Sequence, residues 1–335
     1  MKQIIIVGFI SVFLLNVGCA NQIIPGYDEV LSPTVNDALK IESESTYSKD
    51  NKHAVCVDLS KYSKHERGLL YTNLVGDEVQ NIVRHILLDA GADEDSLSDF
   101  FEWVNQYNTV MRELGSMPLV SEFTQIDMNF VFYDLKNIAV GIRWADVGYR
   151  DIFCRMVAFH LLRPIINIQN LLPEVQWYVM SGNDDDFSRS TLFGDLMVFQ
   201  DNPYIEWPQY EISRYFTLFN PVMLYEDVAE DELHEVLLTM WKERGVTFVE
   251  SKLSLVSIWR INEYNEFANS HAAVLAELNN GLLLVEKTNP YFPYQALFFN
   301  NISEVKSYLV EQLASSYLTS DTDTYIVMRN DELVQ

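Results

Sequence analysis

The run "HAAVLAELNNGLLLVEK" at residues 271–287 constrains the fold of this chain more than any other stretch. Two apolar segments flank the dipeptide Asn280-Gly281, and Asn-Gly favours the two-residue turn of a β-hairpin. Strands joined by such a turn run antiparallel, so this part of the chain is expected to lie in an antiparallel sheet. Other strand-like runs share the second half of the chain, namely "KLSLVSIWRI", "YQALFF" and "TYIVMR".

Helical periodicity dominates the first half of the chain. "DEVQNIVRHILLDAG" places its apolar residues on one face, and Gly91 is expected to cap its C-terminus. Further helices are predicted for "SLSDFFEWVNQYNTVMREL", "CRMVAFHLL" and "EDELHEVLLTMWKERG". A helical first half followed by an antiparallel sheet in the second half predicts an α+β fold.

The N-terminal segment has the pattern of a secretory signal. Lys2 precedes an apolar run, which ends at Gly18-Cys19. The run is too short for a comfortable membrane span, so residues 1–18 are predicted to be a signal peptide. Its ending resembles a bacterial lipobox, although Asn16 stands where such signals usually carry leucine. The resemblance implies lipidation of Cys19, and the alternative is an uncleaved N-terminal anchor.

The rest of the chain divides into a tether and one domain. Residues 19–52 are polar, with two prolines and a Ser/Glu cluster, and are expected to form a lipid-anchored flexible tether. Residues 53–335 suffice for a single α+β domain. This organisation predicts an exported lipoprotein whose partner is a membrane, reached through the lipid anchor at Cys19. That membrane is either the bacterial cell membrane or the outer membrane.

The charge balance excludes several classes of partner. The chain carries 23 Lys and Arg residues against 48 Asp and Glu residues, a formal net charge of −25. Such a surface repels phosphate backbones and anionic headgroups, so no nucleic-acid partner is expected. The sequence also shows no nucleotide or flavin motif and no metal-type spacing of Cys and His. We therefore expect no cofactor and no metal site.

Cys154 is the first candidate for chemistry. It stands where the predicted helix "CRMVAFHLL" begins, among unpaired backbone N–H groups that favour thiolate over thiol, and Arg155 adds positive charge. Two structural alternatives remain, because a free cysteine is commonly a buried apolar residue. It also has one potential disulfide partner, Cys56, which we expect to be a structural, free thiol.

A thiolate nucleophile needs a base, and His271 is the best candidate. His160 lies six residues after Cys154, about 240° around the helix, and cannot fold back onto it. The remaining histidines lie in polar or helical segments without a local reason to be chosen. His271 opens the strand-like run of the hairpin, 117 residues after Cys154. The order of thiol and imidazole resembles that of papain-like cysteine enzymes, which implies an orienting polar group on the next strand.

Hairpin register selects the third candidate. With Asn280-Gly281 as a two-residue turn, His271 faces Pro290, and Glu286 lies on the same side of the sheet as His271. A three-residue loop would instead place Lys287 and Asn289 on that side. Glu286 also stands inside an apolar run, where an unpaired carboxylate is costly and a hydrogen bond to His271 would offset the cost. Turn chemistry favours Glu286 over Asn289; the structural alternative for Glu286 is a salt bridge or a solvated edge.

Several segments together resemble a bacterial lipoprotein family, domain-of-unknown-function family 4300. They are "LLYTNLVGDEVQ", "DFFEWVNQYN", "CRMVAF", "FTLFNPV", "HAAVLAELNNGLLLVEKTNPYFPYQALFF" and "YIVMRNDEL". The resemblance covers about residues 68 to 335 and implies a His-Asn-Cys-Arg motif. Cys154-Arg155 matches this motif, whereas Ile152-Phe153 replaces its His and Asn. The departure implies altered or lost activity.

Two functions remain open. The first is an exported lipoprotein with a papain-like Cys154-His271-Glu286 site, a thiol hydrolase or acyltransferase of the cysteine peptidase or amidase type. It would act on an amide or ester at the cell envelope. The second is a non-catalytic cell-surface binding lipoprotein with a degenerate papain-like fold. Aromatic-rich segments such as "NPYIEWPQYEISRYF" would then line a groove for sugars or peptide. Arg155 and Asn289 are the predicted binding residues.

Overall fold

The structure is a computed structural model that describes residues 68–114, 119–133, 151–174, 192–224, 228–262, 265–315 and 324–335. All of them belong to the compact unit Ser32–Gln335. The predicted signal peptide, the lipidation residue Cys19, the tether and Cys56 lie outside the described residues. Within the described ranges, no helix combines the length and the apolar character that crossing a bilayer requires.

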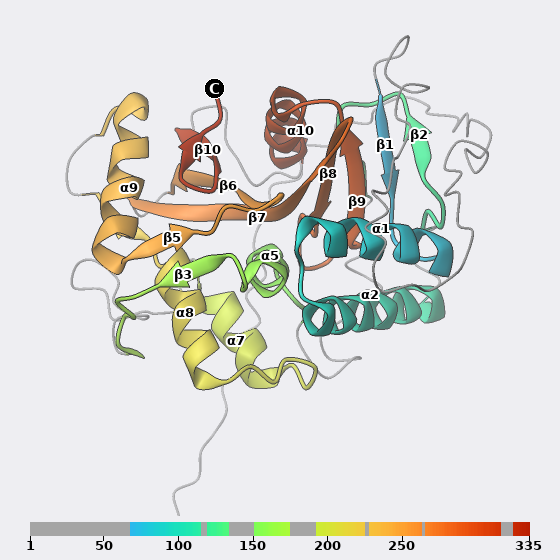
Figure 1. The fold of residues 1–335 in the computed structure, drawn as a ribbon, viewed down its shortest axis with the longest axis horizontal. Coiled ribbons are helices and arrows are strands. Elements are labelled where there is room, and N and C mark those ends of the chain that lie inside the picture. Colours follow the sequence, from blue (N-terminus) through green and yellow to red (C-terminus); the bar gives the residue numbers. More distant parts are fainter. Residues whose placement is uncertain are drawn as a thin grey trace, which may run out of the picture. The chain divides into compact units, whose positions relative to one another are not determined.

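A nine-stranded sheet organises the described part of the chain (Figure 1), and all its pairings are antiparallel. Its main path is β11-β10-β6-β7-β8-β9-β1-β2, and β4 pairs with β7 outside this path. β3 and β5 form a separate antiparallel pair. The strands are β1 (Leu69–Thr72), β2 (Thr124–Ile126), β3 (Ile166–Ile168), β4 (Val222–Met223), β5 (Val246–Phe248), β6 (Leu253–Ile261), β7 (Glu266–Leu278), β8 (Gly281–Glu286), β9 (Gln295–Phe299), β10 (Tyr325–Arg329) and β11 (Glu332–Leu333).

Helices pack against this sheet and against one another. α5 packs on β7 with neighbouring contacts to β6 and β8, and α2 packs on α5. Figure 1 shows α5 beneath β7 and α1 beside α2, while α10 packs on β9. The helices are α1 (Asp77–Ala90), α2 (Glu94–Leu114), α5 (Cys154–Leu162), α7 (Phe193–Asp201), α8 (Gln209–Phe219), the 3-10 turn η3 (Glu230–Glu232), α9 (Leu233–Arg244) and α10 (Ile302–Ser315).

The periodic segments form the predicted elements. α1, α2, α5 and α9 occupy the four runs predicted as helices, and β6 to β10 occupy the strand-like runs. Gly91 caps α1 as expected: its φ of 108° is readily adopted only by glycine, and its N–H donates to carbonyls of the last turn. The mixed α/β class with an antiparallel sheet is therefore confirmed. The sheet also takes β1 and β2 from the first half, which the sequence pattern did not indicate.

The hairpin register differs from the prediction. Leu278 pairs with Gly281, so the turn residues are Asn279-Asn280 and Gly281 begins β8. The pairing is displaced by two positions, and continuing it brings His271 opposite Thr288 instead of Pro290. Because side chains alternate with a period of two, this displacement leaves every side chain on its predicted face. Glu286 therefore stays on the side of His271 despite the wrong turn.

β7 is longer than predicted, and its bulge lies beside His271. The strand begins at Glu266, so His271 lies inside the strand and not at its start, as the sequence had indicated. Ile258 of β6 pairs with His271 and Trp259 pairs with Asn269, which leaves Ser270 as an extra residue. A bulge bends the strand and re-aims the adjacent side chain. The local geometry of His271 is thus set by an irregularity that hydrophobic alternation does not reveal.

Candidate active site

Cys154 is the first residue of α5. Phe153 precedes it with an extended backbone and makes no side-chain capping hydrogen bond. The Phe153 carbonyl accepts the N–H of Met156 at 3.1 Å and of Val157 at 3.2 Å, so the N–H of Cys154 precedes the helical hydrogen bonds. The thiol is free and the residue is only 7% exposed. The predicted position at a helix N-terminus is confirmed, and the thiol is buried there.

Glu286 binds His271 directly. The Oε2 atom of Glu286 lies 2.6 Å from the Nε2 atom of His271, and both side chains are buried. A carboxylate accepts hydrogen bonds, so this contact places a proton on Nε2 and leaves Nδ1 for other chemistry. The carboxylate in the apolar run of β8 therefore pairs with the imidazole of the neighbouring strand.

The thiol and the imidazole perturb each other. Burial raises the pKa of the Cys154 thiol, but the hydrogen bond and charge of His271, the charge of Arg155 and a backbone hydrogen bond from Ala272 outweigh it. The net pKa shift is downward. Burial lowers the pKa of His271, whereas hydrogen bonds to Cys154 and Glu286 and the charges of both partners raise it, to about 10. Both shifts favour a thiolate-imidazolium pair.

The Cys154 thiol and the His271 ring influence each other's pKa. Nδ1 of His271 has no hydrogen-bond partner of regular geometry within the described part of the chain. The mutual pKa shifts nevertheless include hydrogen bonding between this ring and the Cys154 thiol. The structure brings the predicted thiol, imidazole and carboxylate together in one buried cluster.

A second set of buried groups holds Glu286. The Oε1 atom accepts the hydroxyl of Tyr308 at 2.5 Å and the amide of Gln295 at 2.8 Å. The Oε1 atom of Gln295 in turn accepts the hydroxyl of Tyr133 at 2.5 Å. Tyr308, from α10, and Gln295, from β9, thus fix the carboxylate that fixes the His271 ring.

Arg155 binds protein groups. Its Nε and Nη2 atoms donate to the two carboxylate oxygens of Asp195 at 2.8 and 2.9 Å, and its Nη1 atom donates to the Asn269 carbonyl at 2.9 Å. Tyr215 donates to the same carboxylate at 2.5 Å. The Asn269 carbonyl lies at the bulge next to His271. Arg155 therefore ties the first turn of α5 to the strand that carries the imidazole.

Lys287 and Asp151 form an ion pair next to the site. The Nζ atom of Lys287 lies 2.5 Å from the Oδ2 atom of Asp151. The Lys287 side chain is fully buried, with Nζ 4.4 Å from the ring centroids of Tyr107 and Tyr294. Glu286 and Lys287 therefore do not pair with each other, because Glu286 binds His271 and Lys287 binds Asp151.

Asn289 forms a turn. Its Oδ1 atom accepts the N–H of Tyr291 at 2.9 Å, and its carbonyl accepts the N–H of Phe292 at 2.9 Å. The residue is half-buried just beyond β8. Glu286, and not Asn289, forms the hydrogen bond to His271.

His160 is a core residue. Its Nε2 atom lies 3.1 Å from the Ser96 carbonyl, and its ring stacks on Trp207 with centroids 5.6 Å apart. Burial and the charge of Arg163 lower the pKa of His160 to about 3, although the hydrogen bond to Ser96 opposes the shift. Asp99 also lies 3.4 Å from Nε2, but its side chain is 57% exposed. The neutral imidazole is thus part of the packed core.

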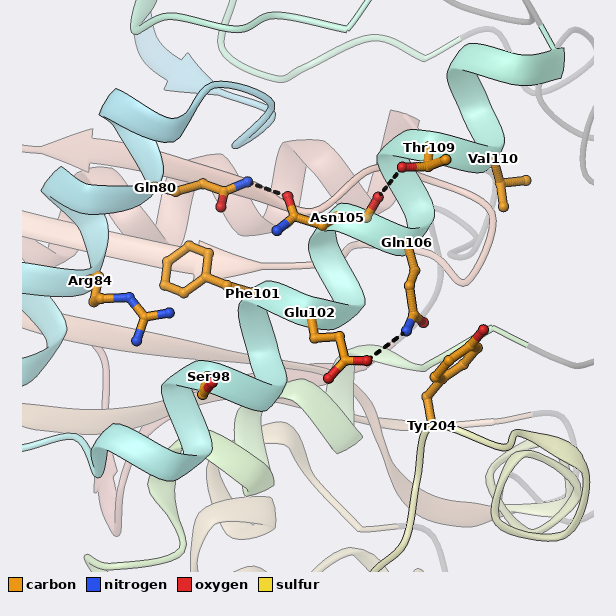
Figure 2. A pocket seen from close by; sticks show the side chains of 10 residues that line it. All are labelled: Gln80, Arg84, Ser98, Phe101, Glu102, Asn105, Gln106, Thr109, Val110 and Tyr204. Atoms are coloured by element: carbon orange, nitrogen blue, oxygen red, sulfur yellow. Dashed lines mark hydrogen bonds between the residues drawn. The ribbon is translucent and has the colours of Figure 1, made fainter.

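Two surface grooves lie away from these residues. One, of about 600 Å³, runs along α2 beside α1 and Tyr204. Figure 2 shows its polar side chains bonded to one another: Gln80 donates to Asn105 at 2.7 Å, and Gln106 donates to Glu102 at 3.2 Å. Tyr204 belongs to the aromatic-rich segment predicted to line a groove and is 40% exposed.

The other groove, of about 1100 Å³, is lined by α9, by the segment that follows β3 and by β4. Its lining mixes apolar residues such as Val236 and Met240 with charged residues such as Glu235. Trp207 and Tyr215, which share the aromatic-rich segment with Tyr204, pack with Phe159 and Phe199. The segment therefore contributes mainly to the core.

Sequence reasoning missed several supporting groups. Gln295 stands in the buried strand β9, and the argument that singled out Glu286 in an apolar run applies equally to it. Tyr308 and Asp151 gave no such signal, because their contacts join elements far apart in the sequence. Among the described residues, no group of three or more His, Cys, Asp or Glu side chains is placed to hold a metal ion.

The fold and the site together define a mixed α/β protein with an antiparallel sheet and a buried Cys-His-Glu cluster. The family model described as Domain of unknown function (DUF4300) matches residues 70–334, and the chain therefore belongs to this family. This confirms the resemblance seen in the sequence. Searches of curated proteins and of solved structures gave no match.

Proposed function

We propose that the chain is a thiol hydrolase or acyltransferase with a papain-like arrangement of Cys154, His271 and Glu286. The observation that carries this proposal is the buried His271–Glu286 hydrogen bond of 2.6 Å, on a ring that also lowers the pKa of Cys154. A thiolate beside an imidazolium, with a carboxylate on the far ring nitrogen, is the arrangement that nucleophilic acyl transfer requires.

The reaction follows from the roles of these atoms. The Sγ atom of Cys154 attacks the carbonyl carbon of an amide or ester, and the carbonyl electron pair moves to its oxygen. The backbone N–H of Cys154 is available to that oxyanion. The bond to the leaving group breaks as His271 protonates it, which leaves a thioester. His271 then deprotonates water, whose oxygen attacks the thioester, and the departing sulfur returns as thiolate.

The two predicted binding residues take different roles in this proposal. Arg155 acts through the Asn269 carbonyl and Asp195, and is therefore a positioning residue. Asn289, half-buried just beyond the end of β8, is proposed as a substrate contact. Asn289→Asp, which introduces a negative charge, should raise the half-saturating concentration of a substrate without changing Cys154 alkylation.

Thiol reactivity tests the proposal. The rate of Cys154 alkylation by iodoacetamide can be measured by mass spectrometry from pH 5 to pH 10. Below the ordinary thiol pKa of about 8.5, this rate should stay constant over a range of pH and not fall with the loss of thiolate. Cys154→Ala should abolish labelling at this residue. His271→Ala should remove the plateau, so that alkylation follows an ordinary thiol titration. A profile that is the same with and without His271 would show that the pair does not form.

The cellular setting is part of the proposal. The lipobox-like ending at Gly18-Cys19 supports export and lipid anchoring, so we propose an amide or ester of the cell envelope as substrate. Cys19→Ser should move the protein from the membrane to the soluble fraction or leave the signal uncleaved. Unchanged fractionation and mass would contradict the anchor.

The alternative is a cell-surface binding protein that has lost catalysis. The low exposure of Cys154, at 7%, favours it, as do Ile152 and Phe153 in place of the motif His and Asn. The open groove beside Tyr204 would then be a contact surface. The alkylation series separates the two functions, because a binding protein has no need of a His271-dependent thiolate.

A further inference from the structure

We infer that the ion pair of Lys287 and Asp151 is a clamp that holds the start of α5 against the end of β8 and so positions the Cys154 thiol opposite His271. This inference rests on the proposed function, since a clamp matters only if thiol and imidazole act together. Lys287 and Asp151 are positioning residues in this scheme.

The carboxylate of Asp151 joins two parts of the chain. Its Oδ1 atom accepts the N–H of Ile152 at 2.7 Å, and its Oδ2 atom accepts Nζ of Lys287 at 2.5 Å. Asp151 lies three residues before Cys154, and Lys287 directly follows β8. One side chain therefore connects the backbone that leads into α5 with the strand that carries Glu286.

The ammonium group of Lys287 has a narrowly defined position. Its Nζ atom lies 4.4 Å from the ring centroids of both Tyr107 and Tyr294, where the negative ring faces attract a cation. The hydroxyl of Tyr107 donates to the Tyr291 carbonyl at 2.6 Å, which fixes that ring. A buried ammonium is costly to desolvate, and an apolar residue would fill the same space without that cost. The buried charge thus calls for a role beyond packing.

Two consecutive residues hold the two halves of the site. Glu286 binds the His271 ring, and Lys287 binds Asp151 before Cys154. Burial lowers the pKa of Lys287, while the charge and hydrogen bond of Asp151 and the charge of Cys154 oppose that shift. The charged groups that act on the thiol are His271 and Arg155.

A purely electrostatic effect of Lys287 on the thiol predicts a different result for the Asp151 variant than the clamp does. If Lys287 acted only as a positive charge, removing Asp151 would leave that charge unbalanced and stabilise the thiolate. If the ion pair positions α5, removing either partner should separate thiol from imidazole. Asp151→Ala and Lys287→Met therefore distinguish the two explanations by the sign of the Asp151 effect.

The experiment measures Cys154 alkylation by iodoacetamide against pH in the full chain. Both Asp151→Ala and Lys287→Met should lower the rate at pH 6 by about tenfold, the factor that one pKa unit gives, and should change the rate at pH 9.5 by less than about twofold. The double variant should match the slower single variant, because the two residues act as one unit. Lys306→Met is the matched control, since Lys306 is a half-buried lysine that donates to the Val334 carbonyl. It should leave the profile unchanged.

The outcomes separate this inference from the proposed function. A faster rate at pH 6 in Asp151→Ala, or no change in either single variant, overturns the clamp while His271→Ala still tests the thiolate-imidazolium pair. If His271→Ala has no effect, the proposed function fails and the clamp fails with it. A variant that does not fold is replaced by the apolar pair Asp151→Leu with Lys287→Met, which should fold and still lose the low-pH rate.

Discussion

The Glu286 carboxylate is held by three hydrogen-bond donors. Nε2 of His271 lies 2.6 Å from one oxygen, and Tyr308 and Gln295 donate to the other. A carboxylate can accept all three, whereas a carboxamide has one accepting oxygen and one donating NH₂ group. Both side-chain oxygens of residue 286 must therefore accept hydrogen bonds, so a polar side chain with a single accepting oxygen does not suffice.

Glu286→Gln tests this requirement. The variant places an NH₂ group against at least one donor, so we expect a loss of about 1–3 kcal/mol in the free energy of unfolding. The low-pH alkylation rate of Cys154 should also fall, though less than in His271→Ala, because the amide still holds the ring. Urea unfolding and alkylation measure the two effects. Glu286→Asp keeps the charge and is the matched control; if it and Glu286→Gln behave alike, the acceptor argument fails.

The residues of the cluster differ in how far the sequence revealed them. Cys154 and Glu286 were found because each breaks a local pattern, one at a helix start and the other inside an apolar strand. Asp151 contacts Lys287 from a position 136 residues away, and no local pattern marks that contact. Local patterns therefore predict members of the Cys-His-Glu cluster but not the side chains that support them.

At the scale of elements, the sequence predicted which face of the sheet each side chain of the β7–β8 hairpin occupies, but not which residues of the two strands pair. The turn lies at Asn279-Asn280, although Asn280-Gly281 has the stronger turn preference. A displacement of two residues preserves both faces of the sheet, so the hydrophobic pattern does not distinguish the registers. The bulge at Ser270 was hidden because β7 is buried on both faces there, so its sequence has no alternation of apolar and polar residues that a bulge would interrupt.

The hydrophobic pattern also did not predict the short strands β1 and β2. β1 is a four-residue strand, yet it joins the sheet between β9 and β2. A run as short as Leu-Leu-Tyr-Thr does not distinguish a buried strand from part of a helix. Tertiary pairing with β9 decides the conformation of β1, and this pairing spans most of the described chain.

At the scale of the whole molecule, buried His160 links stability to pH. Its folded-state pKa of about 3 lies below the unfolded value of about 6.5, so the unfolded chain binds this proton more tightly. The stabilisation is complete above pH 6.5 and is lost as the pH falls from 6.5 toward 3. Between pH 8 and pH 5 the loss should be about 2 kcal/mol.

His160→Gln isolates this contribution. Glutamine can donate to the Ser96 carbonyl without titrating, so the free energy of unfolding of the variant should fall less steeply between pH 8 and pH 5. Urea unfolding at several pH values gives the difference between the two curves, which cancels the carboxylates common to both. His85→Gln, at an exposed position on α1, should follow the parent chain. Parallel curves for His160→Gln and the parent would contradict a neutral buried imidazole.

The adjacency of Glu286 and Lys287 has a consequence for the lengths that this segment can take. Neighbouring residues on an extended chain point to opposite sides, and here each side receives a different partner, His271 or Asp151. Inserting or deleting one residue between the turn at Asn279-Asn280 and Lys287 would move Glu286 and Lys287 to opposite faces of the sheet, away from their present partners. Relatives that keep the cluster should therefore vary the length of their loops but hold this interval constant.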